Sequence, residues 1–147
     1  MLRWETIAIE PDWIDYNGHL NMAAYLVIFD RAIDRLIDHV GLASEPGDAP
    51  TLFAASAKID YLRELPATAT PDCTTTVVRV DDKRVHSWQE LVVGGAVHAR
   101  CENLHLHVDR RGSAKVAPFS PDVRKRLEEL AAAPPPWLAA PVAGRMG

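Results

Sequence analysis

The stretch DYNGHLNMAAYLVIFDRAIDRLIDHVGL, residues 15–42, decides how the rest of the chain is arranged. It opens with a carboxylate, two amides and an imidazole within seven residues and continues as an amphipathic segment. Apolar residues recur in that segment at spacings of three and four, with charged residues between them, which predicts a helix. Asn21 is a suitable N-cap for this helix, and Gly41 is a suitable residue to end it.

The polar residues before the helix predict a reactive site. The loop would deliver Asp15, Asn17 and His19 to the helix N-terminus, where unpaired N–H groups and the positive end of the helix dipole stabilise negative charge. This arrangement suits attack on the acyl carbon of an ester or thioester, because the carboxylate can activate water or attack directly while N–H groups hold the oxyanion. The backbone donors expected for this role are those of Met22, Ala23 and Ala24.

The same residues also have a purely structural interpretation, in which Asp15 and Asn17 cap turns and His19 packs in a polar pocket. Two aspartates on the helix, Asp30 and Asp34, are rival candidates for the reactive carboxylate. Asp15 is preferred because Asn17 and His19 accompany it, whereas Asp30 has only an arginine beside it.

The pattern Asp-x-Asn-x-His-x-Asn-x-x-x-Tyr over residues 15–25 resembles that of hotdog-fold acyl thioesterases, including plant acyl-ACP thioesterases and the 4-hydroxybenzoyl-CoA thioesterase group. Three further segments resemble thioesterases associated with carnitine and betaine metabolism: residues 11–42, LHVD at 106–109 and APFSPDV at 117–123. The similarity covers nearly the whole chain and is strongest in residues 9–42. It implies an acyl-CoA thioesterase that needs no cofactor or metal and acts on a small acyl-CoA.

The resemblance to carnitine-linked enzymes makes betainyl-CoA a candidate substrate. Trp13 and Tyr16 flank Asp15, and an aromatic face attracts a trimethylammonium group; the alternative is that Trp13 packs into the sheet and Tyr16 lines the pocket mouth. Tyr25 matches the helix tyrosine of the family. For the phosphates of coenzyme A, the expected basic partners lie near predicted strand ends and are Arg63, Lys83 and Arg84.

Composition places the chain among ordinary globular domains. Its 147 residues suffice for one domain, expected over residues 1–133, with a tail rich in Pro, Ala and Gly at 134–147. A net charge of −4 without a basic run argues against a nucleic-acid partner. Two cysteines, no signal-like start and no long apolar run predict a cytoplasmic protein with free thiols and no membrane span.

The order of the predicted elements indicates an α+β hotdog fold, an antiparallel sheet wrapped around one long central helix, which should assemble as a homodimer or tetramer. The apolar face of the last strand, with Leu104, Leu106 and Val108, should meet that helix. A short helix with Ser120 as its cap should span residues 121–133. Strands are expected at residues 2–9, 51–65, 72–80, 84–93 and 96–108.

Other functions remain open at this level. Cys101, His105 and His107 share a strand face and offer donors for zinc, but their spacing is poor and no fourth ligand is evident. The absence of a Gly-x-Ser-x-Gly motif disfavours an α/β-hydrolase. The main alternatives to a thioesterase are a non-catalytic acyl-CoA-binding hotdog protein and a hotdog enoyl-CoA hydratase.

Overall fold

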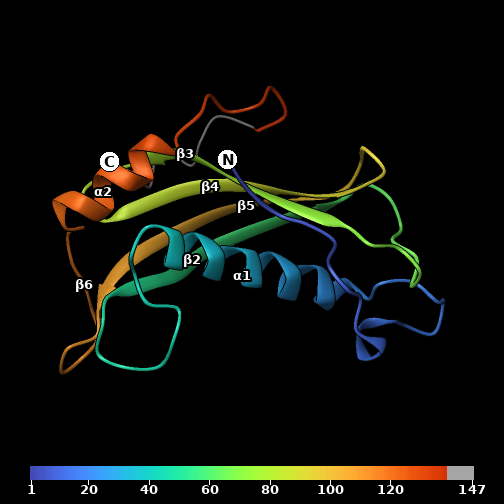
Figure 1. Ribbon diagram of the computed structural model, residues 1–147, viewed down its shortest axis with the longest axis horizontal. Helices are drawn as coiled ribbons and strands as arrows, with labels where there is room; N and C mark the ends of the chain where they lie inside the picture. The colour runs from blue at the N-terminus through green and yellow to red at the C-terminus, as the bar shows by residue number, and fades with distance from the viewer. Residues whose placement is uncertain (139–147) are drawn as a thin grey trace.

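The computed structural model describes residues 1–138 as one curved antiparallel sheet that wraps around a central helix (Figure 1). The strand order is β1-β3-β4-β5-β2, and the short β6 pairs with the far end of β5. The predicted hotdog arrangement is therefore confirmed. The elements in chain order are β1 (Leu2–Trp4), the 3-10 helix η1 (Pro11–Trp13), α1 (Met22–His39), β2 (Thr51–Tyr61), β3 (Asp72–Val80), β4 (Arg84–Val93), β5 (Ala96–Asp109), β6 (Lys115–Val116) and α2 (Pro121–Glu129).

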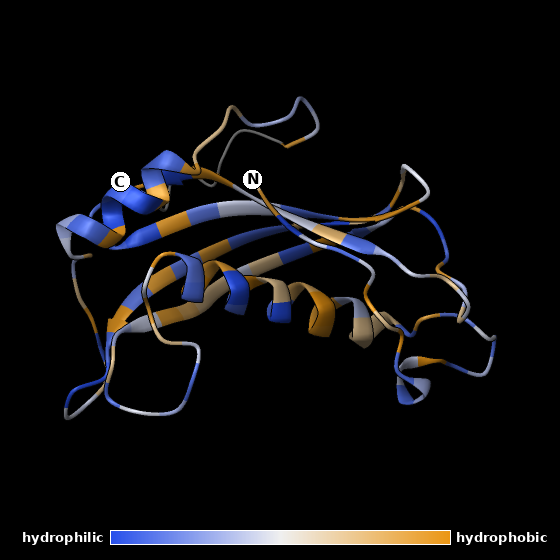
Figure 2. Cartoon of the chain, in the orientation of Figure 1, coloured by the Kyte–Doolittle hydropathy of each residue, from blue (hydrophilic) through white to orange (hydrophobic). Residues whose placement is uncertain are grey.

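Helix α1 begins where the sequence predicts. The Asn21 side chain accepts a hydrogen bond from the Ala24 N–H at 2.9 Å, which satisfies one of the free donors of the first turn. Apolar and charged residues alternate around the helix, so that one side is buried against the sheet (Figure 2). The buried residues of α1 are Ala24, Tyr25, Ile28, Phe29, Ala32, Ile33, Leu36 and Ile37.

Three elements are shorter than predicted, each for a local reason. Strand β1 stops at Trp4 because Thr6 adopts a positive φ of 53° and its N–H bonds the Asp72 side chain. Strand β2 ends at Tyr61, and the next residues turn towards the loop before α1. Helix α2 ends at Glu129 because the chain joins the bulge of β3, where the Ala132 N–H donates to the Val77 carbonyl.

The expectation about the inner face of β5 is wrong. Cys101 packs in the same core cluster as Phe29 of α1, and Asn103 bonds the Gln89 side chain beneath the helix. The polar face of β5, which also carries His105, thus meets α1, and the face with Leu104 turns away from it. Burial lowers the pKa of His105 to about 4, so its imidazole is neutral at pH 7.

A hydrogen-bonded network makes this polar burial tolerable. The fully buried Gln89 amide donates to the Phe29 carbonyl of α1 at 2.9 Å and to the Thr75 hydroxyl at 3.1 Å. Its oxygen accepts from the Asn103 amide at 2.9 Å, and the Asn103 oxygen lies 3.2 Å from the Cys101 sulfur. The network ties three strands to the middle of α1 and fixes the helix against the sheet.

Both cysteines are unpaired and lie in this interior. Cys73 is 1% exposed and Cys101 is fully buried. Burial raises the pKa of Cys101 to about 12 and raises the pKa of Cys73 further. Both are therefore protonated thiols at physiological pH.

The outer face of the sheet is partly covered by the chain after α2. Trp137 packs edge-on against Trp88 of β4 with ring centroids 5.3 Å apart, and the Arg100 guanidinium lies 4.5 Å from the Trp137 ring. The rest of the predicted tail, residues 139–147, lies outside the described residues. Over residues 1–138, neither helix has both the length and the apolar character needed to cross a membrane.

Candidate active site

A cavity of about 410 Å³ opens beside the N-terminal end of α1. The loop before α1 forms one wall of it, and the chain that leaves β2 forms the other. Two contacts join these walls: an isolated bridge between His19 and Pro66, and a hydrogen bond of 2.8 Å from the Leu20 N–H to the Leu65 carbonyl. The lining residues are Asp15, Asn17, His19, Leu20, Met22, Tyr25, Tyr61, Leu62, Arg63 and Glu64.

The loop holds the Asp15 carboxylate by one oxygen. Oδ1 accepts from the Asn17 N–H at 2.8 Å and from the His19 N–H at 3.3 Å. The Asp15 N–H in turn donates to the His19 carbonyl at 2.9 Å, and Gly18 closes the turn at a φ of 77°. Within residues 1–138 Oδ2 has no hydrogen-bond partner, so Asp15 both caps its turn and presents a free oxygen at the cavity.

The first turn of α1 supplies fewer donors than predicted. Asn21 already occupies the Ala24 N–H, through its side-chain oxygen at 2.9 Å and its carbonyl at 3.1 Å. Ala24 therefore cannot serve as an oxyanion donor. The N–H groups of Met22 and Ala23 have no hydrogen-bond acceptor in the described part of the chain, and Met22 borders the cavity.

His19 and Asn17 lie on the same wall as Asp15. His19 is one-third exposed, and its Nε2 lies 3.4 Å from an Oε2 of Glu64 on the opposite wall. The Asn17 side chain has no hydrogen-bond partner among the described residues. Both side chains are thus placed to contact a ligand that sits over Asp15.

Two tyrosines supply the aromatic lining of the cavity. The rings of Tyr25 and Tyr61 meet edge-on with centroids 5.1 Å apart. The Tyr61 hydroxyl donates to the Met22 carbonyl at 3.1 Å, which links β2 to the first turn of α1. Burial raises the pKa of both tyrosines, so both hydroxyls stay protonated and neutral.

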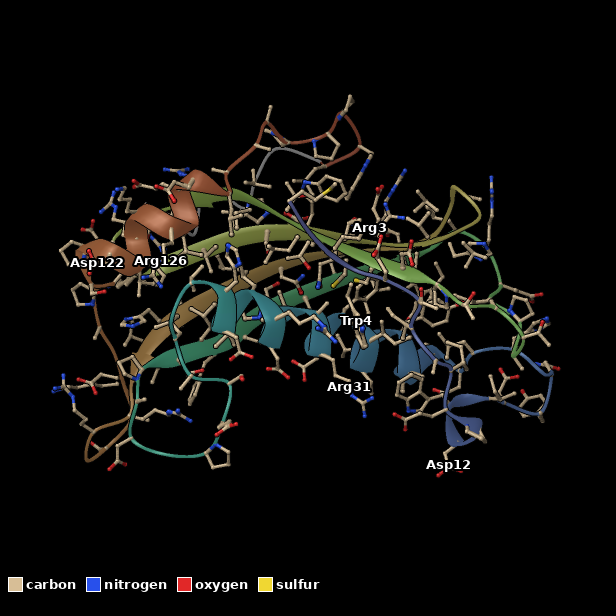
Figure 3. The ribbon with its side chains drawn as sticks, in the orientation of Figure 1. Arg3, Trp4, Asp12, Arg31, Asp122 and Arg126 are labelled. Carbon is tan, nitrogen blue, oxygen red and sulfur yellow. The ribbon has the colours of Figure 1, made fainter. Side chains whose placement is uncertain are left out.

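The aromatic residues beside Asp15 in sequence do not line this cavity. Trp13 is 9% exposed and packs in the core, with the Arg31 guanidinium 4.9 Å from its ring centroid; Arg31 lies along the outer side of α1 (Figure 3). Tyr16 is 98% exposed and lies outside the cavity-lining set. The aromatic surface available to a substrate is that of Tyr25 and Tyr61.

The basic residues predicted for coenzyme A are divided between two ends of the molecule. Arg63 lines the cavity, whereas Lys83 and Arg84 belong to the β3–β4 turn at the opposite end of the sheet. Arg84 also forms a 2.6 Å ion pair with Asp81. The rival carboxylates of α1, Asp30 and Asp34, are absent from the cavity lining as well.

Sequence reasoning missed the wall formed by the end of β2. Tyr61, Leu62 and Glu64 of this wall border the cavity, as does Leu20 of the loop before α1. The only sequence signal for this wall is an aromatic residue followed by charged residues and Pro66 at the end of a predicted strand. That signal marks a strand end without saying which loop it meets.

Together these groups are suited to acyl transfer. A carboxylate with one free oxygen stands beside two unpaired helix N–H groups, in a cavity large enough for a small acyl thioester. No group of three or more His, Cys, Asp or Glu side chains in the described chain is arranged to hold a metal ion.

Comparisons with known proteins agree with this chemistry. A family model described as the thioesterase-like superfamily matches residues 9–127. Betainyl-CoA thioesterase of Pseudomonas aeruginosa is 38% identical over 127 residues, which cover 84% of this chain and 79% of that protein. An L-carnitine dehydrogenase/betainyl-CoA thioesterase of Agrobacterium fabrum is 30% identical over 88% of this chain, which spans 27% of that protein's length.

Solved structures share the fold. A putative thioesterase of Pseudomonas putida is 34% identical with a TM-score of 0.80, and the match covers 95% of this chain and 96% of that one. A Thermus thermophilus thioesterase, solved with coenzyme A and Zn, has a TM-score of 0.74 at 20% identity over 90% of this chain and 95% of its own. The chain therefore belongs to the thioesterase-like superfamily and is a thioester hydrolase of the hotdog fold.

Proposed function

We propose that the protein hydrolyses a small acyl-CoA to the free acid and CoA, with Asp15 as its catalytic carboxylate. The observation that carries this proposal is the free Oδ2 of Asp15 at a cavity shared with the unpaired N–H end of α1. A cytoplasmic location is part of the proposal, because acyl-CoA is an intracellular substrate and both cysteines are free thiols.

Asp15 can act in either of two ways. As a general base it takes a proton from water, whose oxygen attacks the thioester carbon. As a nucleophile it attacks that carbon itself and forms an anhydride that water then cleaves. In both cases the carbonyl oxygen gains negative charge next to Met22 and Ala23, the C–S bond breaks, and the CoA thiolate leaves and takes up a proton. Asn17 and His19 would position the carboxylate, the water or the carbonyl.

A thiol-release screen over short, branched, aromatic and trimethylammonium acyl-CoAs tests the proposal directly. A thioesterase frees the CoA thiol, whereas a non-catalytic acyl-CoA-binding protein frees none. An enoyl-CoA hydratase adds water across a double bond and keeps the thioester intact. Binding of acyl-CoA without release of thiol from any substrate would overturn the proposal.

We propose betainyl-CoA as the preferred substrate. The relatives named betainyl-CoA thioesterases support this choice, as does the cavity itself. The rings of Tyr25 and Tyr61 and the carboxylate of Glu64 all line it. Aromatic faces and carboxylates are the groups that attract a trimethylammonium cation.

Betainyl-CoA is expected to have a kcat/KM roughly tenfold higher than that of 3,3-dimethylbutyryl-CoA, its uncharged tert-butyl analogue. A cation over an aromatic face gains about 0.5–2 kcal/mol, which corresponds to a preference of that order. The measurement is kcat/KM for both compounds under identical conditions. Tyr61→Leu should reduce the preference. Equal values for the two substrates would remove the argument from charge.

We also propose that the protein forms a homodimer through α1 and β2. The outer edge of β2 is unpaired within the described chain, and its middle carries only small exposed residues, 54–57. An unpaired edge of eleven residues is a ready template for a second strand. Large exposed apolar side chains gather on these two elements and directly after β2: Met22, Leu26, Val27, Phe53, Tyr61 and Leu62.

Leu26→Asp is expected to convert the dimer into a monomer of the same fold. Leu26 is 45% exposed in the single chain, so the change costs little within one subunit but places two charges in the interface. Light scattering measures the mass, and circular dichroism confirms the fold. Arg31→Ala, on the opposite side of α1, is the matched control and should remain dimeric. A folded monomer of the parent protein would contradict the proposed assembly.

A further inference from the structure

The carbonyl of Trp13 joins the active-site loop to the start of α1. It accepts two hydrogen bonds from Asn21, one from the backbone N–H at 2.8 Å and one from the side-chain Nδ2 at 2.9 Å. The Asn21 side-chain oxygen accepts from the Ala24 N–H at the same time, so both ends of this side chain are engaged. The position of Trp13 therefore fixes where α1 begins relative to the loop.

The proposed catalytic groups are attached directly to this junction. An isolated bridge between Ile14 and Leu20 closes the base of the loop between Trp13 and Asn21. Asp15 lies one residue inside the bridge, and the unpaired helix N–H groups follow Asn21 directly. A shift of Trp13 would therefore change the distance between the carboxylate and the oxyanion donors.

Arg31, on the outer side of α1, holds the segment that carries Trp13 (Figure 3). Its guanidinium lies 4.9 Å from the Trp13 ring centroid and forms a 2.7 Å ion pair with Glu10. Glu10 is the residue before η1, and its carbonyl accepts a hydrogen bond from the Trp13 N–H at 2.9 Å. One arginine side chain thus contacts both ends of η1.

The two attachments of this segment are far apart along α1. Arg31 lies nine residues beyond Met22, which corresponds to about 14 Å at about 1.5 Å per residue. A short segment that is held at one point can pivot, whereas a segment held at two separated points on a helix keeps one orientation. The Asn21 hydrogen bonds supply the first point, and the Arg31 contacts supply the second.

The charge of Arg31 has no other acidic partner in the described chain. Within residues 1–138 it forms an ion pair with Glu10 alone, and it does not line the active-site cavity. The two side chains are 47% and 48% exposed, and exposed pairs of this kind add little to global stability. The pair is therefore suited to fixing a local orientation rather than to holding the fold together.

A second arginine of α1 provides an internal comparison. The Arg35 guanidinium lies 4.5 Å from the ring centroid of Trp4, one helical turn further along α1. Trp4 belongs to β1 and is separated from the active-site loop by residues 5–14, so this contact holds the N-terminal strand. Arg35 repeats the aromatic contact of Arg31 without its connection to the loop.

We propose that Arg31 is a positioning residue of the active site. By keeping Trp13 against α1 it aligns Asp15 with the N–H groups at the helix start. This inference rests on the proposed role of Asp15. The attacking group and the oxyanion donors must be aligned in the transition state, whereas the cavity wall after β2 has no hydrogen bond to Arg31 and can still bind the substrate. Loss of Arg31 should therefore lower kcat and leave KM nearly unchanged.

Arg31→Met tests this role, because methionine keeps an unbranched side chain over the Trp13 ring and removes the charge. It should lower kcat for the best acyl-CoA roughly tenfold, with KM within about twofold of the parent. Arg31→Lys should recover most of kcat, because the pair with Glu10 uses a single nitrogen. Arg35→Met is the matched control and should leave kcat unchanged. Parent-like kcat for Arg31→Met, or an equal loss for Arg35→Met, would overturn the proposal.

A double-mutant cycle tests whether Arg31 acts through Glu10. Glu10→Gln removes the ion pair from the other side and should also lower kcat. When both changes are combined, kcat should be no lower than in Arg31→Met alone, because the same contact is lost only once. Losses that multiply in the double variant would show that the two residues act independently and would refute the proposal.

Hydrogen exchange gives a readout that does not depend on turnover. In Arg31→Met the backbone amides of residues 15–24 should exchange faster than in the parent, while those of β4 and β5 keep their rates. If the parent frees no thiol from any acyl-CoA, the proposed function fails, and faster exchange would still show that Arg31 holds the loop. If kcat falls while the exchange of the loop is unchanged, Arg31 does not act by positioning, and this proposal fails while the proposed function stands.

Discussion

Asp15→Asn is expected to lower kcat by a factor of roughly 10² or more, as is usual when a general base or nucleophile is lost. The asparagine keeps the size of the side chain and an oxygen that can accept the Asn17 and His19 N–H bonds now made by Oδ1. The loop should therefore hold its shape, and only the charge and basicity of the free oxygen disappear. Steady-state kinetics with the best acyl-CoA measure the loss, and thermal unfolding shows whether the fold persists.

Asp30→Asn and Asp34→Asn are the matched controls, because both carboxylates lie on α1 outside the cavity. Each control should retain nearly the full kcat. If Asp15→Asn turned over within about threefold of the parent, the assignment would fail. Glu64, the other carboxylate at the cavity, would then be the next residue to replace.

Gln89→Glu is expected to lower the free energy of unfolding by roughly 3–5 kcal/mol, the usual consequence of burying an uncompensated charge. Gln89 is fully buried, and its amide donates to the Phe29 carbonyl and the Thr75 hydroxyl. A carboxylate of the same shape would place an oxygen against the Phe29 carbonyl. The shift of the urea midpoint at constant m-value measures the effect.

The pH dependence of this variant distinguishes charge from shape. Burial should raise the pKa of the new carboxyl in the folded state, so the unfolded chain ionises first as pH rises. The stability deficit should thus grow from about pH 4.5 to about pH 8. Gln89→Met, which removes the hydrogen bonds without adding a charge, should cost about 1–3 kcal/mol with no such dependence. Equal deficits for both variants at every pH would contradict the role given to the network.

The elements that local patterns control could be predicted from the sequence. The Asn21 cap and the apolar face of α1 depend on residues close together in the chain. The inner face of β5 could not be predicted by hydropathy, because its polar side is satisfied by Gln89, which is distant in sequence. Alternation shows that a strand has two faces, but partners elsewhere determine which one is buried.

The residues of the candidate site likewise fall into two groups, those placed by local spacing and those placed by partners distant in the sequence. Asp15, Asn17 and His19 share one short loop, so their spacing alone brings them together. For Trp13 the sequence leaves two possibilities open, contact with a substrate or packing in the core. The structure places it in the core with the Arg31 guanidinium 4.9 Å from its ring centroid, because contacts from a residue eighteen positions away decide the outcome. Lys83 marks a strand end, but a sheet has two ends, and antiparallel pairing decides which of them meets the active loop.

Because both cysteine thiols are buried, the folded protein should not react with thiol reagents. A thiol with a pKa of about 12 or higher is almost wholly protonated at neutral pH, and neither sulfur reaches solvent without opening of the sheet from α1. An aromatic disulfide reagent that gives a coloured product on reaction with thiols can therefore measure the CoA thiol released by hydrolysis. The thiols of the folded enzyme itself do not contribute to the signal. The same reagent reports denaturation, because both sulfurs become reactive when the interior is exposed.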